Sequence, residues 1–177
     1  MDTKLGKLAC VANAIHYGLY KLFLSGHIRF HNLTGRYIPQ RFKNRIQRNF
    51  EKAAPFTFFD NENGWLISFT HHNFGYLWSA YAGFFSFILM GIMARLSIRL
   101  SGIYEILILI LPVAVGYLPI YLYVFKDDQY LKYFREFEKK GKDWQKKWKR
   151  VALWFMIGAL PTLFLGIIIM DCIIKGK

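Results

Sequence analysis

The side chains best suited to chemistry near the start of this 177-residue chain are histidines and arginines. His27, Arg29, His31 and Arg36 lie within ten residues of one another. Arginine binds phosphate and histidine transfers protons, and a metal-independent ribonuclease needs both tasks. The same residues in a basic segment are also suited to contacting lipid headgroups. We favour the headgroup interpretation and keep nuclease activity as an alternative.

A second pair of candidates is His71-His72. Neighbouring helical residues point about 100° apart, so adjacent histidines do not readily bind one metal ion. No HExxH motif or acidic cluster accompanies them, and Cys10 and Cys172 lie far apart without metal-ligand spacing. The sequence also has no glycine-rich phosphate loop and no specific catalytic set. We therefore expect no metal, no cofactor and no enzymatic activity.

Two acidic residues, Glu105 and Asp171, lie inside apolar runs. An ionisable residue within a membrane is costly and is a functional hypothesis by default. We favour the simpler interpretation, in which both lie at the membrane surface and pair with Arg95 and Arg99.

Most of the chain that carries these residues is predicted to form apolar helices. The chain is 54% hydrophobic, with a mean hydropathy of +0.20. Apolar runs near 74–94, 103–125 and 151–170 are each long enough to cross a hydrocarbon core of about 30 Å. Residues 5–25 have the periodicity of an amphipathic helix that lies on the membrane or packs against the bundle, and a fourth span is an alternative. The predicted fold is a single all-α, multi-pass membrane domain over 1–177, with three to four membrane helices.

The net charge of +13 is unevenly distributed along the chain. Seven Lys and Arg lie in residues 26–52 and ten in 126–150, against Arg95 and Arg99 in the short connection between two spans. Because basic loops stay on the cytoplasmic side, this predicts that the basic and aromatic segment 26–73 and the basic helix-loop 126–150 are cytoplasmic. We expect a bacterial inner membrane, with lipid as the main partner. Direct nucleic-acid binding by the basic charge remains an alternative.

Small residues recur along the predicted spans. Glycine and threonine at such spacing allow helices to approach closely, which predicts interfaces between helices or between copies of the chain. The interface candidates are Gly75, Gly83, Gly158, Thr162 and Gly166. If copies form a ring, polar residues on one helix would face water, and the candidates for lining such a pore are Asn73, Ser79 and Ser86.

In size, basic charge and the arrangement of a His/Arg-bearing helical region with membrane helices, the chain resembles the small membrane accessory proteins encoded beside the RNA-guided ribonuclease of type VI-B CRISPR systems. One branch of that family is a divergent HEPN-like domain that forms an oligomeric inner-membrane pore and strengthens antiviral defence by depolarising infected cells. HEPN ribonucleases carry Arg, four to six residues, then His. Here His31 and Arg36 have that spacing in reverse order. The resemblance therefore implies a HEPN-like remnant without catalytic residues.

Three functions follow from these observations. The leading hypothesis is a homo-oligomeric inner-membrane pore that assists antiviral defence by depolarisation, with a functional link to an RNA-guided ribonuclease. The first alternative is a non-enzymatic membrane scaffold whose basic face binds an acidic protein or RNA. The second is a HEPN-like nuclease.

Overall fold

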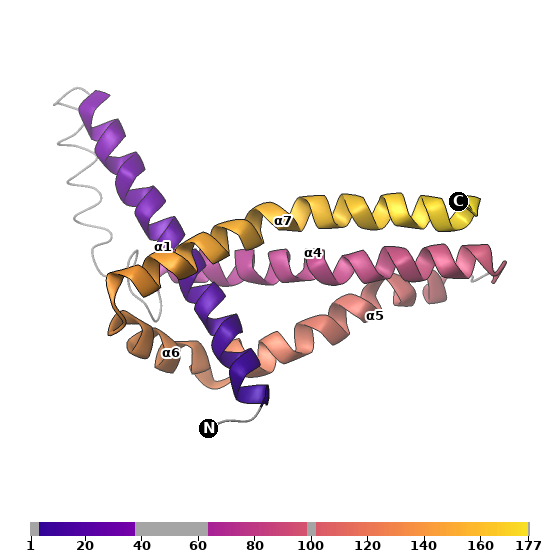
Figure 1. Ribbon diagram of the computed structural model, residues 1–177, viewed down its shortest axis with the longest axis horizontal. Helices are drawn as coiled ribbons and strands as arrows, with labels where there is room; N and C mark the ends of the chain where they lie inside the picture. Colours follow the sequence, from indigo (N-terminus) through magenta and orange to yellow (C-terminus); the bar gives the residue numbers. More distant parts are fainter. Residues whose placement is uncertain (1–3, 38–63, 99–101, 177) are drawn as a thin grey trace.

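The computed structural model describes residues 4–37, 64–98 and 102–176, and this part of the chain is helical without any strand. The all-α prediction is confirmed. Two irregular turns, a π-helix and a 3-10 helix, separate the second membrane helix from the short helix that follows it (Figure 1). In chain order the elements are α1 (Lys4–Tyr37), α4 (Trp65–Arg95), α5 (Ile103–Ile120), η1 (Tyr121–Phe125), η2 (Lys126–Asp128), α6 (Gln129–Glu138) and α7 (Lys142–Lys175).

Three helical stretches in the described residues are long and apolar enough to cross a membrane: Trp65–Arg95, Ile103–Glu138 and Lys142–Lys175. They contain the three predicted spans. At 1.5 Å per residue, the 34 residues of α7 extend about 50 Å, well beyond a hydrocarbon core of about 30 Å. Its first turns therefore emerge from the membrane.

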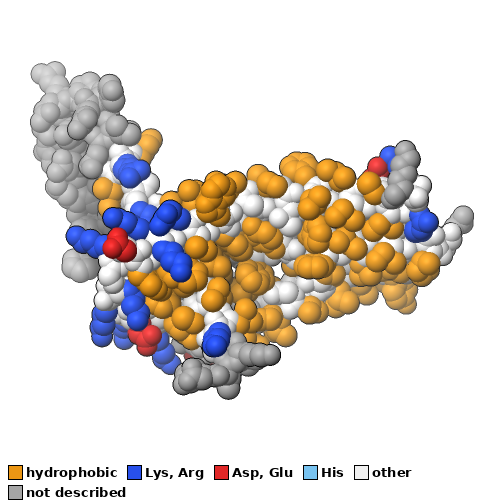
Figure 2. All heavy atoms as spheres, viewed as in Figure 1, with side chains coloured by type: hydrophobic (Ala, Val, Ile, Leu, Met, Phe, Trp, Pro, Cys, Tyr) orange, Lys and Arg blue, Asp and Glu red, His pale blue; other side chains and the backbone are white. Residues whose placement is uncertain are grey.

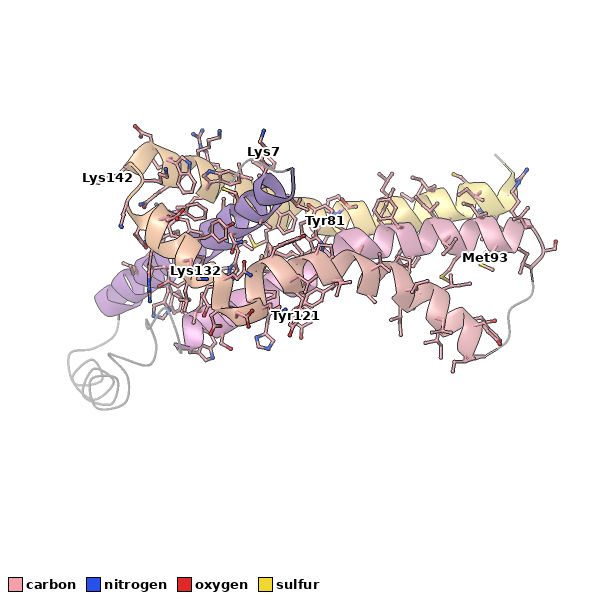
Figure 3. All side chains as sticks on the ribbon, turned by 90° about the horizontal axis from the view of Figure 1, so that it is seen from below. Lys7, Tyr81, Met93, Tyr121, Lys132 and Lys142 are labelled. Carbon is pink, nitrogen blue, oxygen red and sulfur yellow. The ribbon has the colours of Figure 1, made fainter. Side chains whose placement is uncertain are left out.

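Helices α4 and α7 form the centre of the bundle and run side by side in the same direction (Figure 1). Small residues allow this approach, because a β-carbon added at Gly166 would lie 3.2 Å from Phe84 Cα, and one added at Gly91 would lie 3.1 Å from Met170 Cα. Helix α5 returns along α4, and its first half leans away from α4 toward the end that carries Met93 (Figure 3).

Two prolines, Pro112 and Pro119, lie inside α5. A proline lacks the N–H of a helical hydrogen bond and distorts the preceding turn, which frees carbonyl groups for other donors. In each case the carbonyl three residues earlier accepts a hydrogen bond from a side chain of α4. The Ser86 hydroxyl donates to Leu109 O and the Trp78 indole N–H donates to Gly116 O, each at 2.8 Å. The side chains of α4 thus hold both distorted turns of α5.

Helix α1 crosses one end of the α4–α7 pair instead of lying apart from it (Figure 1). It is not among the membrane-spanning candidates of the described chain, so packing against the bundle is the alternative that the structure supports. The predicted apolar stripe is only part of its buried surface. The polar residues Asn13 and His16 are also fully buried, because α4, α6 and α7 surround the middle of α1.

Several predicted boundaries differ from the structure. Helix α1 continues to Tyr37, so an irregular segment does not begin at residue 26, and Gly26 and Gly35 lie within a helix. Residues 38–63 of the predicted basic and aromatic segment 26–73 lie outside the described part, whereas residues 65–73 of that segment belong to α4, which begins at Trp65. Aromatic residues at helical spacing within 126–150 predict that the second span continues into this segment as one helix, and this prediction is wrong. The chain turns between α5 and α6, where Asp127 and Asp128 adopt positive φ angles of 55° and 50°.

Lysine and arginine side chains gather at one end of the molecule, over α6, the first turns of α7 and the adjoining part of α1 (Figure 2). We call this the basic end. At the opposite end Asp171 accepts a hydrogen bond from Lys175 at 2.6 Å, while Arg95 Nη1 donates to Ile173 O at 3.0 Å. The predicted pairing of Asp171 with an arginine is therefore wrong in the case of Arg95. Lys175 is one helical turn away on the same face, and Arg95 instead donates to Ile173 O in the last turn of α7, which also accepts the backbone N–H of Gly176.

Candidate functional site

A buried histidine, His16, lies where α1, α4 and α6 meet. Its side chain is 0% exposed. Five aromatic rings surround it, with ring centroids 4.8 to 5.8 Å from the His16 centroid: His71 and Phe74 of α4, Phe125 of η1, and Tyr130 and Phe134 of α6. We call these six residues the histidine cage. The cage was not predicted from the sequence. The helical spacing of Tyr130 and Phe134 does indicate an aromatic helix face that would pack against another element.

Neither ring nitrogen of His16 has a hydrogen-bond partner among the described residues. Burial, together with a smaller effect of His71, lowers the pKa of His16 well below its ordinary value of 6.5. The ring is therefore neutral at pH 7. A buried polar group without a partner costs about 1–3 kcal/mol, so stability alone gives no reason for a histidine here.

Asn13, one turn before His16, links α1 to the π-helical turn η1 through a hydrogen bond. Its amide Nδ2 donates to Ala9 O at 2.8 Å and to Tyr123 O at 2.9 Å. A π-helical turn disturbs the regular pattern of backbone hydrogen bonds, and such turns are frequent at functional sites. Here the turn presents a backbone carbonyl of η1 to α1 beside the histidine cage.

His71 connects the cage with the surface. Its ring lies 4.8 Å from His16 and 4.5 Å from Tyr130, between centroids. Its Nδ1 is 2.6 Å from Ile67 O. Because a carbonyl only accepts, Nδ1 carries the hydrogen and Nε2 keeps its lone pair. His71 can therefore exchange a proton through Nε2 and stands between the buried histidine and an open groove.

That groove, of about 470 Å³, runs between α4 and α5. Its polar side chains come mainly from one face of α4, where His72, Tyr76 and Ser79 follow one another at helical spacing. Tyr76 is 72% exposed. We call this the polar groove. The other lining residues are His71, Gly75, Ile110, Val113, Ala114, Tyr117 and Phe125.

The three predicted pore-lining residues have different surroundings. Ser79 lines the polar groove. Asn73 is partly exposed and donates to Phe69 O of its own helix at 2.8 Å. Ser86 is fully buried and bonded to α5, which does not agree with a pore-lining role. It serves instead to satisfy a carbonyl near Pro112.

The small residues that we proposed as interfaces contact other helices of the same chain. A β-carbon at Gly158 would lie 2.6 Å from Tyr81 Oη, and one at Gly83 would lie 3.3 Å from Leu163 Cδ2. Gly166 packs on Phe84 as described above, and Gly75 faces Tyr117 of α5. Thr162 donates to Gly158 O at 2.7 Å. The row on α7 is thus a contact within the bundle, and the structure gives it no role between copies.

Two of the predicted positions have no described side chain. His31 and Arg36 lie in the last turns of α1, and the structure does not describe their side chains. In the described residues, no three His, Cys, Asp or Glu side chains come close enough to hold a metal. In the His71-His72 pair, the Nδ1 of His72 lies 2.8 Å from Ser68 O of its own helix.

The fold and the site define a small all-α membrane protein with three spans, a helix packed across one end, and a histidine cage beside an open groove. Comparison with known protein families, curated proteins and solved structures finds no match for the chain.

Proposed function

We propose that copies of this chain assemble in a bacterial inner membrane into a channel-like protein, with the polar groove bordering the path for ions. The proposal rests on one observation: the polar side chains of His72, Tyr76 and Ser79 line a groove that no other part of the described chain covers. The exposed side chains of α5 around this groove are apolar. Polar residues at membrane depth are costly against lipid and mark pathways in transporters and channels. In an assembly this face would meet water.

Assembly is part of the proposal because a single copy leaves the groove open toward lipid. In a ring, each copy can present the same groove to a central axis. The exposed apolar side chains of α5 and α7, such as Leu111, Leu118 and Phe164, would then face lipid or a neighbouring copy. By the positive-inside rule we place the basic end in the cytoplasm.

Ion flux into liposomes tests the channel. Purified protein should carry ions across the bilayer, and a Tyr76→Leu/Ser79→Leu variant should lose most of that flux, because an apolar groove repels water and hydrated ions. Tyr104→Leu is the matched control. It removes an exposed tyrosine of α5 that does not line the groove, and should conduct like the parent protein.

Flux that survives the double substitution would exclude the polar groove as the path. A reconstituted protein that carries no ions would instead favour the scaffold, in which the basic end binds an acidic protein or RNA. The link to CRISPR-associated defence stays a prediction, tested by phage resistance of cells that express this chain with and without an RNA-guided ribonuclease of the type VI-B class. Nuclease activity stays an alternative, tested by RNA cleavage with His31→Ala and Arg36→Ala variants.

A further inference from the structure

We propose that the chain holds one anionic phospholipid in a two-part groove where α1 crosses α7. The first part, of about 390 Å³, is lined by Leu22, Leu153 and four cationic side chains. These are Arg29 of α1 and Lys146, Lys149 and Arg150 of α7. Guanidinium and ammonium groups converging from two helices are the donors that bind a phosphate group. This inference does not depend on the channel proposal.

The charge in this part is largely uncompensated. Lys149 Nζ donates to the neutral Ser25 hydroxyl at 2.6 Å. Lys146 lies 3.8 Å from Asp143, whose side chain is fully exposed and which does not line the groove. Among the described residues no carboxylate lines this part. Like charges held close together repel, so a bound phosphate would relieve the repulsion.

The second part of the groove is mainly apolar. It adjoins the first part, because Leu22 and Leu153 line both. It measures about 460 Å³ and runs between α1, α4 and α7. Its walls include Trp65 and Phe69, whose rings stack at 5.1 Å between centroids. The remaining lining is Phe23, Phe30, Leu66 and Met156, together with Gly26 and His27. A basic site joined to an apolar one matches an amphiphile, with its phosphate on the cations and an acyl chain along the aromatic wall.

The depth of the groove agrees with a lipid. The apolar run of α7 begins at Val151, directly after Lys149 and Arg150. These two side chains therefore lie at the membrane surface, where phosphate headgroups are found. Basic sites between membrane helices at such a surface bind anionic headgroups. A soluble phosphate compound would use the cations but not the apolar part.

Lipid binding to the full-length protein in phosphatidylcholine nanodiscs tests the proposal, with phosphatidylglycerol as the added probe and native mass spectrometry as the readout. The parent protein should retain phosphatidylglycerol over phosphatidylcholine. An Arg29→Gln/Arg150→Gln variant should bind it about thirty-fold more weakly, since each cation near a membrane surface contributes about a factor of five. Lys132→Gln/Lys139→Gln is the matched control. It removes the same charge from exposed positions outside the groove and should bind like the parent protein.

Two further experiments distinguish a phospholipid from a soluble phosphate compound as the ligand. Glycerophosphoglycerol, the headgroup without acyl chains, should not compete, and Phe69→Ser in the apolar wall should weaken retention of the lipid. An equal loss of phosphatidylglycerol binding in both double variants would show that general surface charge causes the binding, and this result would contradict the proposed site. Competition by the free headgroup, or displacement of the lipid by a short RNA, would equally contradict a phospholipid as the occupant.

Discussion

Replacing Gly18 with alanine should lower the free energy of unfolding by about 3 kcal/mol, near the upper end of overpacking effects. Gly18 of α1 packs directly against the backbone of α7. A β-carbon there would lie 2.4 Å from Trp148 O and 2.9 Å from Ala152 Cβ. The first of these contacts is with backbone, which cannot move aside as a side chain can. The variant should release α1 from the bundle, with a lower midpoint of thermal unfolding in detergent and earlier proteolysis within α1.

Gly26→Ala in the same helix is the matched control. An added β-carbon meets nothing within 4 Å at this position, which is helical and exposed. Alanine favours a helix over glycine by about 0.5–1 kcal/mol, so this variant should be as stable as the parent protein or slightly more stable. Equal unfolding midpoints for Gly18→Ala and the parent would show that α1 does not pack on α7 as described.

Acidification should loosen the packing of α1, because a proton on His16 would place a charge inside the histidine cage. The ionisable groups that face His16 are His71 of α4 and Tyr130 of α6, and neither supplies a negative charge at neutral pH. The pKa of His16 is lowered in the folded chain, so the unfolded chain binds the extra proton first. Stability should therefore be unaffected by this group well above pH 6.5 and should fall below it, by up to about 1.4 kcal/mol per pH unit, until His16 itself is protonated.

His16→Leu should remove this contribution to the pH dependence, since leucine fills similar space without an ionisable group. His72→Leu, which changes an exposed histidine outside the cage, should keep the dependence of the parent protein. Thermal unfolding in detergent between pH 5 and pH 8 measures both. An unchanged pH dependence in His16→Leu would remove His16 as its cause.

The membrane helices were predictable because their signal lies in the local composition of each segment. A long apolar run is enough to predict where α4, α5 and α7 lie along the sequence, without knowing which helices pack against them. The length of α1 was not predictable in the same way. Gly26 and Gly35 are common helix breakers, yet here the helix continues through both to Tyr37. Intrinsic propensity is a weak signal that the surroundings of a helix readily override.

The candidate site depends on contacts between distant segments, and the sequence does not specify these. Polar side chains such as Asn13 and His16 are costly in hydrocarbon, and the structure buries both in protein, against helices that begin at Trp65 and beyond. The row of Gly158 and Gly166 predicted a close helix contact, and such a contact exists. Its partner is α4 of the same chain, because spacing identifies a face that can approach another helix but not which helix approaches it.

Three membrane crossings would place the two ends of α7 on opposite sides of the membrane, and the two cysteines of the chain can report this arrangement. Cys10 lies on α1 toward the basic end, Cys172 lies near the opposite end of α7, and both side chains are exposed. Cys10→Ser and Cys172→Ser variants each keep one thiol for a membrane-impermeant maleimide. Intact cells should label Cys172, whereas Cys10 should react only after the membrane is opened. Labelling of both thiols from the same side would contradict three membrane crossings with the basic end on one side.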